Sequence, residues 1–456
     1  MIGYLILAVL VAFIAVVAVR TIRFRPKPQP EVTKEEIAFN RDAAVDSLAQ
    51  LVRCKTVSYN DHSLEDEGEF QKLISLLPTL YPNVFGTCTF QQLPDRALLL
   101  RWPGKQEGDP AVMMAHYDVV PVNEEKWDKP PFAGVIEDGI LWGRGTLDTK
   151  VTFNGVLSAA NYLIGQGAPN IVAYFTEHGI HPAIVVDEGG AVVENVFPGV
   201  KQPCGLIGIA EKGMLNAQYR TVSAGGHASA PKPHTPVGVL AAACKRVEDH
   251  PFKAHIDGPA AQMFDTLGRY STPLYRVIFA NMWCFGWIID TLGKKSGGEM
   301  NALVRTTVAF TQMEGSSARN VIPPEAKMVS NIRLNPADSV ASALAYLEKT
   351  VNDPAVEITS LESFEPSPVS ETGCDAWEKV ASAVANTWPG CIVSPYLMVQ
   401  CSDSRHYRDL SNHVYRFSAM DLTAEERSTI HGNNERIRLE TVAKAVEFYI
   451  RLMRQC

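Results

Sequence analysis

The chain has 456 residues, of which 46% are hydrophobic and 20% are charged, and this composition is typical of a globular protein with about two or three domains. Its net charge of −8 provides no basic surface for a phosphate backbone, which argues against a nucleic-acid-binding protein. The nine cysteines include no C-x-x-C pair, which excludes a dense disulfide scaffold and a zinc ribbon.

The first segment of the chain is apolar. Residues 2–19 carry no charge and are long enough, as a helix, to cross the hydrocarbon layer of a membrane. Four basic residues and three prolines follow before residue 31, and no basic segment precedes the apolar run. We therefore interpret residues 1–20 as an uncleaved transmembrane anchor and residues 21–31 as an extended stalk. A cleaved signal sequence and a buried helix are the alternatives. The positive-inside rule favours the cytoplasmic side for the rest of the chain, but the side stays open.

The soluble part begins with alternating helical and strand patterns. Thr33 and Glu36 form a capping box, which predicts a helix from Thr33 onward. Short apolar runs at 97–102 and 111–115 predict strands, and the spacing of apolar residues over 154–163 predicts a helix. Strands that alternate with helices indicate an α/β fold built on a mostly parallel, mixed sheet.

A further short buried strand is predicted at 183–186, and it ends in Asp187 and Glu188. The carboxyl ends of parallel strands are where open α/β sheets place their sites. Alternation of polar and apolar residues at 214–222 and again at 327–334 is typical of antiparallel strands, so the middle of the chain reads as an inserted α+β domain.

The last predicted element is an amphipathic helix over 439–453. The resulting domain prediction is a catalytic domain of two segments, 32–210 and 363–456, separated by a lid or dimerisation domain at 211–362.

Two segments carry residues suited to metal chemistry. His116 has Asp118 two positions further on, a spacing that suits a metal ligand oriented by an acid, and Asp148 stands in a glycine-rich turn from which a carboxylate can bridge two cations. Asp187 and His431 could complete the cluster. Taken singly, each has an ordinary structural reading: His116 as a core histidine, Asp148 as a turn or cap residue, and His431 as a surface loop residue.

Eight motifs in order along the chain favour a functional role for these residues over the ordinary structural one. They are AHYDVVPV, PPFAGVIEDGILWGRGTLDTK, AIVVDEGG, AEKGMLNAQ, GGHASAP, NVIPPEAKMVSNIRLNP, CSDSRHY and IHGNNERI. From about residue 40 to its end, the chain resembles the two-zinc metallopeptidases that include carboxypeptidase S, aminoacylase and glutamate carboxypeptidase. The resemblance is strongest to the branch of carboxypeptidase S and the N-fatty-acyl-amino-acid hydrolases. It implies cleavage of an amide bond in a peptide or an N-acyl amino acid.

The resemblance also implies roles for individual residues. His116 and Asp187 would hold one zinc ion, Asp148 would bridge, His431 would hold the second ion, and Asp118 would orient His116.

The residues implied to meet the substrate lie in the middle domain. They are His227 as a polarising donor, Asn320, and Arg333 as a clamp on the substrate carboxylate. Arg405 is a weaker candidate. The alternative for His227 is a turn residue between glycines and Ser229. The implied partners are the small substrate, the membrane and a second copy of the chain through the middle domain, with no nucleic acid.

One family element is not found in the sequence. The family has a strand ending in two adjacent glutamates, the first a general base and the second a zinc ligand. Here only 39 positions separate Asp148 from Asp187. They accommodate a helix to Ile164, a second helix to about Glu177 and the strand at 183–186, so a piece of about 15–25 residues is missing by ordinary element sizes.

This loss would leave one zinc ion with three protein ligands, which is an acceptable site, and the other with two. Glu188 and Glu177 are poor replacements, because neighbouring residues of a strand face opposite sides and Glu177 lies at a helix end. The sheet would have to close with a distorted register, or the chain would be unstable. The sequence equally describes a shortened version of an intact enzyme.

Without the general base, the rate should fall by about 10² to 10⁴. We therefore expect the full chain to hydrolyse N-acyl amino acids and dipeptides at background rates, measured as amino acid released with and without a chelator. Rapid chelator-sensitive turnover would contradict this expectation. A metal-binding protein with one zinc ion and no turnover is the alternative function, and resequencing the DNA between the codons for Leu163 and Gly167 tests whether the gap is real.

Overall fold

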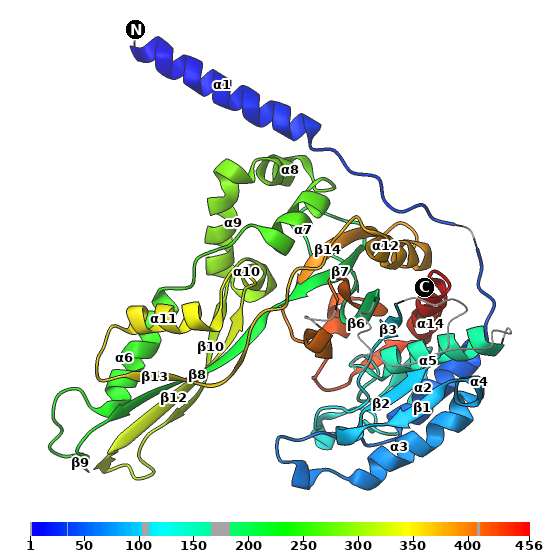
Figure 1. Cartoon of the computed structure of the whole chain (residues 1–456). Helices are drawn as coiled ribbons and strands as arrows, with labels where there is room; N and C mark the ends of the chain where they lie inside the picture. Colours follow the sequence, from blue (N-terminus) through cyan, green and yellow to red (C-terminus); the bar gives the residue numbers. More distant parts are fainter. Residues whose placement is uncertain (1, 34, 103–108, 166–182, 408–410) are drawn as a thin grey trace. The chain divides into compact units, whose positions relative to one another are not determined.

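The computed structural model describes residues 2–33, 35–102, 109–165, 183–407 and 411–456 (Figure 1). The chain divides into two compact units. The first unit comprises residues 1–25, 209–369 and 396–401, and the second comprises residues 26–208, 370–395 and 402–456. The second predicted helix, which ends at about Glu177, lies in segment 166–182, outside the described residues.

The second unit is built around a mixed sheet with the strand order β14-β7-β15-β6-β3. Strands β3, β6 and β15 are mutually parallel, whereas β7 runs antiparallel to β6 and β15. The α/β class and the mixed sheet are thus confirmed. The strands are Ala111–Met113 (β3), Ile184–Val193 (β6), Cys204–Glu211 (β7), Ile392–Met398 (β14) and Val414–Leu422 (β15).

Helices pack against this sheet because each has one apolar stripe to bury. The C-terminal helix α14 contacts α2, α5, α12 and β15, and its residues Val442, Val446 and Ile450 are fully buried. The helices of this unit are Arg41–Val52 (α2), Glu67–Leu80 (α3), Pro82–Thr87 (α4), Lys150–Gly165 (α5), Asp375–Thr387 (α12), Ala424–Ser428 (α13) and Leu439–Met453 (α14).

Two small sheets complete the second unit. The antiparallel pair is Thr89–Gln92 (β1) with Leu98–Arg101 (β2), and the three-stranded sheet is Arg436–Arg438 (β16), Ile140–Trp142 (β5) and Val135–Glu137 (β4). Strand β16 follows the loop of His431, and β5 leads into the turn of Asp148. Their pairing therefore brings together two segments far apart in the sequence.

The helix predicted from Thr33 begins later than expected. Helix α2 starts at Arg41, where the Asn40 side chain accepts the Ala43 N–H and caps the helix. Thr33 instead donates its N–H and its hydroxyl to the Asn386 side chain, so the capping-box prediction is wrong. A tertiary contact to α12 takes the hydrogen bonds that the local pattern assigned to a helix end.

From the sequence we expected the strand at 183–186 to have lost a neighbouring strand. In the structure it is β6, which has a neighbour on each side, β15 and β3. Strand β6 pairs directly with β3, from Ala111 opposite Ile184 to Met113 opposite Val186. On its other side, the register with β15 is irregular: Arg416 lies opposite Asp187, but Phe417 lies opposite Gly190. The pairing of β6 with β3 is thus regular, and the irregular register lies between β6 and β15.

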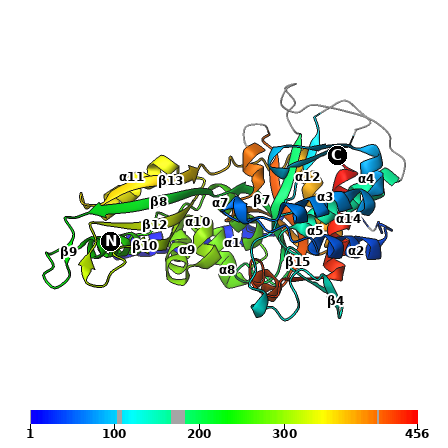
Figure 2. The ribbon, with the colours of Figure 1, turned by 90° about the horizontal axis from the view of Figure 1, so that it is seen from below.

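The first unit contains an antiparallel sheet with the order β10-β12-β8-β13. Strands β8 and β12 lie side by side in both views (Figures 1 and 2). Helices α6 (Pro236–Asp249) and α11 (Val340–Val351) bury Leu240 and Leu347 against the apolar residues of these strands. The strands are Gly213–Val222 (β8), Thr307–Glu314 (β10), Glu325–Leu334 (β12) and Glu357–Phe364 (β13), and a short pair is formed by Gly226–His227 (β9) and Val321–Ile322 (β11).

Helix α8 (Pro273–Ala280) of the first unit contacts the N-terminal helix α1. Helix α1, Ile2–Arg23, has a mean hydropathy of 3.0 over its most apolar window and no buried residue, and it is long and apolar enough to cross a membrane. The others are Pro236–Asp249 (α6), Gly258–Gly268 (α7), Pro273–Ala280 (α8), Met282–Ser296 (α9), Gly298–Val304 (α10) and Val340–Val351 (α11).

A buried lysine joins two of these elements. Lys212, just before β8, is fully buried, and its ammonium group donates to the carbonyl oxygens of Ala302 (3.0 Å) and Arg305 (2.8 Å) at the end of α10. Burial, reinforced by the positive charge of Arg333, lowers the pKa of Lys212 to about 7.

We expect the stability of the protein to rise with pH through this lysine. Between the folded pKa of about 7 and the ordinary value of 10.5, the unfolded chain binds the proton more strongly, so deprotonation favours the folded state in this window. Lys212→Met should lose this rise, measured as the free energy of unfolding in urea from pH 6 to about 10.5. Lys253→Met, at an exposed position, is the control. Parallel pH curves for the wild type and Lys212→Met would refute the assignment.

Candidate metal centre

The candidate site lies in the second unit and is centred on His116, which follows β3. Its Nε2 atom lies 3.1 Å from Asp148 Oδ1 and 3.5 Å from Glu188 Oε1. Its Nδ1 atom lies 3.1 Å from both the carboxylate and the carbonyl oxygen of Asp118. Asp118 in turn accepts a hydrogen bond from the Ser58 hydroxyl at 2.6 Å. The ring is therefore held from its Nδ1 side, and Nε2 faces the carboxylates.

Asp148 stands between two histidines. While Oδ1 faces His116, Oδ2 contacts Nε2 of His431. His431 lies in the loop after α13 with a positive φ of 59°, and its side chain is 61% exposed. A carboxylate whose two oxygens serve two histidines has the arrangement of a bridging metal ligand.

The turn that carries Asp148 is fixed by Glu435, which is fully buried. One oxygen of Glu435 accepts the backbone N–H groups of Gly145, Leu147 and Asp148 at 2.8–3.2 Å. The other oxygen pairs with the Arg144 guanidinium at 2.5 Å. Glu435 therefore determines where the Asp148 carboxylate points. The sequence analysis missed its role, although it lies in the IHGNNERI motif.

The titration of the cluster follows from these contacts. Burial opposes protonation of His116, but its hydrogen bonds to Asp118, Asp148 and Glu188 outweigh burial and raise the pKa of His116. Burial alone would raise the pKa of Asp148, but hydrogen bonds from His116 and His431 prevail and lower it. Burial raises the pKa of Glu188. Anionic groups that are buried together in this way favour a bound cation.

The position of Glu188 differs from the expectation. Both oxygens of Asp187 accept backbone N–H groups, one from Glu188 at 2.8 Å and one from Ser404 at 2.7 Å. Burial and the nearby charge of Glu188 raise the pKa of Asp187 to about 7. The irregular register at Asp187 breaks the alternation of the strand, so Glu188 rather than Asp187 lies beside His116.

The donor set fits a single divalent ion. His116, Asp148 and Glu188 each offer one ligand atom, and these atoms all lie within 4.8 Å of one another. Imidazole nitrogen and carboxylate oxygen are the ligands of three-ligand zinc sites with an open fourth position. The prediction that Asp187 and His431 bind a metal ion stays a prediction.

The residues predicted to meet the substrate fall into two places. His227 and Asn320 lie together, because His227 in β9 pairs with Val321 and the Asn320 carbonyl accepts the Ala228 N–H at 2.9 Å. The His227 ring contacts Ser229. This contact agrees with the alternative interpretation of His227 as a turn residue. Arg333 lies near the other end of β12, where it donates to Asn331 and to the Cys401 sulfur.

Arg405 belongs to the second unit. It lies in a short helical turn, and its guanidinium donates to the Ser402 carbonyl at 2.9 Å and lies 3.7 Å from Asp403.

Comparison with known proteins decides the family. A family model described as "Peptidase family M20/M25/M40" matches residues 112–455. The chain belongs to the M20 peptidase family. The recognition of this family from the sequence motifs is therefore confirmed, and the chain is by family an M20 metallo-hydrolase.

Two curated relatives match nearly the whole chain. One is "N-fatty-acyl-amino acid synthase/hydrolase PM20D1" of Xenopus tropicalis, at 33% identity over 98% of this chain and 94% of the relative. The other is "Probable carboxypeptidase S-like 2" of Dictyostelium discoideum, at 30% identity over 98% and 92%. The alignment to the Xenopus protein runs over 490 positions, 34 more than the chain has residues, so at least that many positions have no counterpart here.

The fold is shared with a solved structure of the family, the "M20 family metallo-carboxypeptidase Sso-CP2 from Sulfolobus solfataricus". The TM-score is 0.64 at 16% identity, and the match covers 90% of this chain and 98% of that one.

We expect Glu435→Gln to destabilise the protein strongly. The substitution leaves the buried Arg144 without its charge partner, and removal of one member of a buried pair costs about 3–5 kcal/mol. The free energy of unfolding in urea measures this loss. Glu425→Gln, which breaks the exposed pair with Arg436, is the matched control and should cost less than about 1 kcal/mol. Equal losses in the two variants would contradict the role of Glu435.

Proposed function

We propose that the chain is a slow zinc-dependent hydrolase for the amide bond of a peptide or an N-acyl amino acid. The observation that carries this proposal is the Asp148 carboxylate, which offers one oxygen to His116 and the other to His431. Membership of the M20 family supports the reaction class. The two relatives described above, one an N-fatty-acyl-amino acid synthase/hydrolase and one a probable carboxypeptidase, support the substrate class.

His116, Asp148 and Glu188 would hold the zinc ion, with His431 at the other oxygen of Asp148. A bound zinc ion supplies a Lewis acid that polarises the substrate carbonyl. Asp118 and Ser58 fix the His116 ring so that Nδ1 carries the proton and Nε2 offers its lone pair. Glu435 holds the turn of Asp148 in place.

The slow rate follows from the position of Glu188. Its carboxylate lies 3.5 Å from His116 and belongs to the ligand group, so it is not available as a separate general base. Loss of general-base catalysis lowers a rate by about 10² to 10⁴. In contrast to the background rate expected from the sequence alone, the chain should accordingly show chelator-sensitive turnover, but slower than that of relatives that have the glutamate pair.

We also propose that α1 anchors the chain in a membrane as an uncleaved helix. Its length, its mean hydropathy of 3.0 and the basic residues Arg20 and Arg23 at its end support an anchor. A cleaved signal sequence is the alternative, and the mass of the mature protein distinguishes the two.

A homodimer is supported by the distance between the predicted substrate residues. Arg333 is eight residues along β12 from Glu325, which is about 26 Å at 3.3 Å per residue, and the β9–β11 pair with His227 lies beyond Glu325. One chain does not bring His227 and Arg333 to one small substrate, whereas two copies can each contribute one. Light scattering on the purified full chain should give the mass of two chains.

Metal content tests the proposed centre. We expect the full chain to bind zinc at the His116 centre and Glu188→Gln to bind it at least tenfold more weakly, because a charged ligand is lost. Titration with a chromophoric zinc chelator gives the affinity, and the assay for released amino acid gives the rate. Glu194→Gln, an exposed residue at the end of the same strand, is the matched control.

If Glu188→Gln binds zinc as tightly as the wild type while Asp187→Asn does not, Asp187 is the ligand and the assignment of Glu188 is wrong. Tight zinc binding with no chelator-sensitive hydrolysis would replace the hydrolase by a binding protein.

A further inference from the structure

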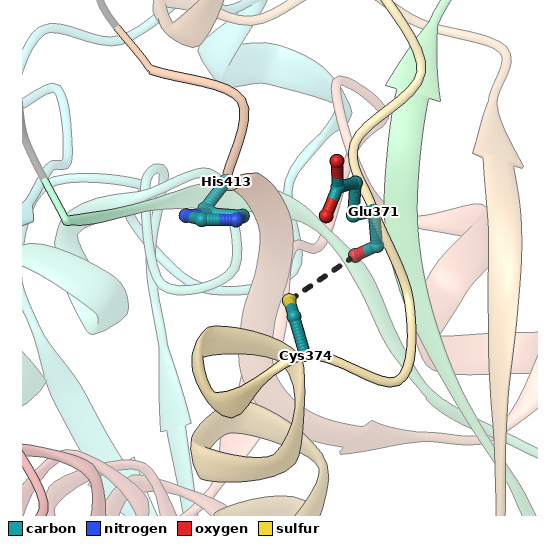
Figure 3. A group of neighbouring side chains, drawn as sticks. All are labelled: Glu371, Cys374 and His413. Atoms are coloured by element: carbon teal, nitrogen blue, oxygen red, sulfur yellow. Dashed lines mark hydrogen bonds between the residues drawn. The ribbon is translucent and has the colours of Figure 1, made fainter.

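A second group of metal-binding side chains lies away from the His116 centre. Glu371, Cys374 and His413 approach one another where the loop before α12 meets the segment before β15 (Figure 3). Each offers one ligand atom, and the three atoms lie within 4.8 Å of one another. Glu371 is exposed, and the other two are half-buried.

The His413 ring is prepared for a metal ion. Its Nδ1 atom lies 3.0 Å from the Ala183 carbonyl oxygen, so Nδ1 carries the proton and Nε2 keeps its lone pair. A backbone carbonyl that holds the other ring nitrogen is the usual support of a metal-binding histidine.

The same tyrosine, Tyr415, contacts the Cys374 side chain and the backbone of Glu371. The Tyr415 hydroxyl donates to the Glu371 carbonyl oxygen at 2.8 Å and lies 3.4 Å from the Cys374 sulfur. Cys374 is also the N-cap residue of α12, where the positive end of the helix dipole favours an anionic ligand.

We propose that Glu371, Cys374 and His413 form a second site for a thiophilic divalent ion such as zinc. Thiolate, imidazole and carboxylate are three protein ligands that zinc accepts, and they leave a fourth position open. The cysteine distinguishes this site from the His116 centre, whose described ligand group contains only nitrogen and oxygen.

Cobalt(II) tests the proposal because only a thiolate ligand gives a strong sulfur-to-metal charge-transfer absorption in the near ultraviolet. The full chain, kept in detergent and loaded with cobalt(II), should show this absorption. Cys374→Ser should lose it together with one bound ion per chain, and His413→Ala should weaken the site at least tenfold. Cys456→Ser, at the exposed C-terminus, is the matched control and should keep the absorption.

The proposal is overturned if the absorption is missing in the wild type, or if Cys374→Ser keeps both the absorption and the ion. A circular-dichroism spectrum like that of the wild type shows that each variant is folded. Binding at the His116 centre is followed separately by Glu188→Gln.

A different observation concerns apolar surface next to α1. Helices α8 and α9 expose large apolar side chains, among them Leu274 (73%), Trp283 (58%), Trp287 (65%) and Leu292 (54%). Trp283 and Trp287 are one helical turn apart and therefore share a face of α9. Side chains of this size and exposure mark an interaction surface.

This surface is continuous with the apolar helix α1. The Asn281 amide, between α8 and α9, donates to the Val17 carbonyl and the Thr21 hydroxyl of α1. The Trp283 ring packs edge-on against Phe13, with 5.9 Å between ring centres. Figure 1 shows the N-terminus at the end of α1 remote from α8.

These contacts set the depth of the surface. Phe13 lies seven residues before Arg20, about 10 Å along the helix axis at 1.5 Å per residue. If Arg20 lies at the headgroups, then Trp283 lies at the level of the acyl chains, within the depth of about 5–10 Å typical of interfacial helices. Arg20 and Arg23 line a cavity of about 390 Å³ together with Asp265 and Arg269, and the Arg20 guanidinium donates to the Ala280 carbonyl oxygen at 3.2 Å.

We infer that α8 and α9 insert their tryptophan face into the headgroup and acyl boundary of the same bilayer that α1 crosses. This inference rests on the proposed anchor. Tryptophan is favoured at this boundary, since its ring is apolar and its N–H is polar.

Phospholipids brominated high on their acyl chains test the inference by quenching nearby tryptophans. The full chain in such vesicles should show partial quenching, and the double variant Trp283→Phe, Trp287→Phe should lose it. Trp377→Phe, Trp388→Phe removes two buried tryptophans and should keep the quenching.

Flotation with vesicles tests the anchor separately. A chain that floats without quenching overturns the insertion of α8 and α9 alone, and a chain that does not float overturns both.

Discussion

The two oxygens of the Asp148 carboxylate contact His116 and His431 at the same time. The candidate centre depends on this pair of contacts. A carboxylate can make both contacts only if its backbone is held in one orientation. The buried Glu435 provides this by accepting the N–H groups of the turn, and Arg144 offsets the charge of Glu435. The turn and the His431 loop, 283 residues apart in the sequence, meet through the pairing of β5 with β16.

The closure of the main sheet explains the ligand group. With β6 paired directly to β3, the chain around Asp187 follows an irregular register against β15. The irregularity turns Asp187 towards backbone N–H groups and brings Glu188 to His116. A carboxylate therefore stays beside His116, but it comes from a neighbouring position. The proposed site for one ion rests on this arrangement, and the proposed hydrolysis is slow because Glu188 belongs to the proposed ligand group.

The first unit joins two kinds of surface. His227 lies beyond one end of β12 and Arg333 lies near the other end. This separation supports the proposal that a second copy of the chain contributes one of the two residues. Helices α8 and α9 of the first unit continue the apolar surface of α1 and suit a lipid boundary. An enzyme for acylated amino acids would gain from this placement, because substrates with long acyl chains partition into the bilayer.

The sequence by itself determined the family and the α/β class, because these depend on motifs and on hydrophobic period, and it predicted His116, Asp148 and His431 as site residues. It also located several helices and strands, including α5, β8 and α14. Tertiary structure decided the rest. The start of α2 moved because Thr33 is held by Asn386, and Glu188 took the place beside His116 because strand register depends on pairing. The role of Glu435 and the Glu371, Cys374 and His413 group depend on contacts between distant segments, which spacing in the sequence does not encode.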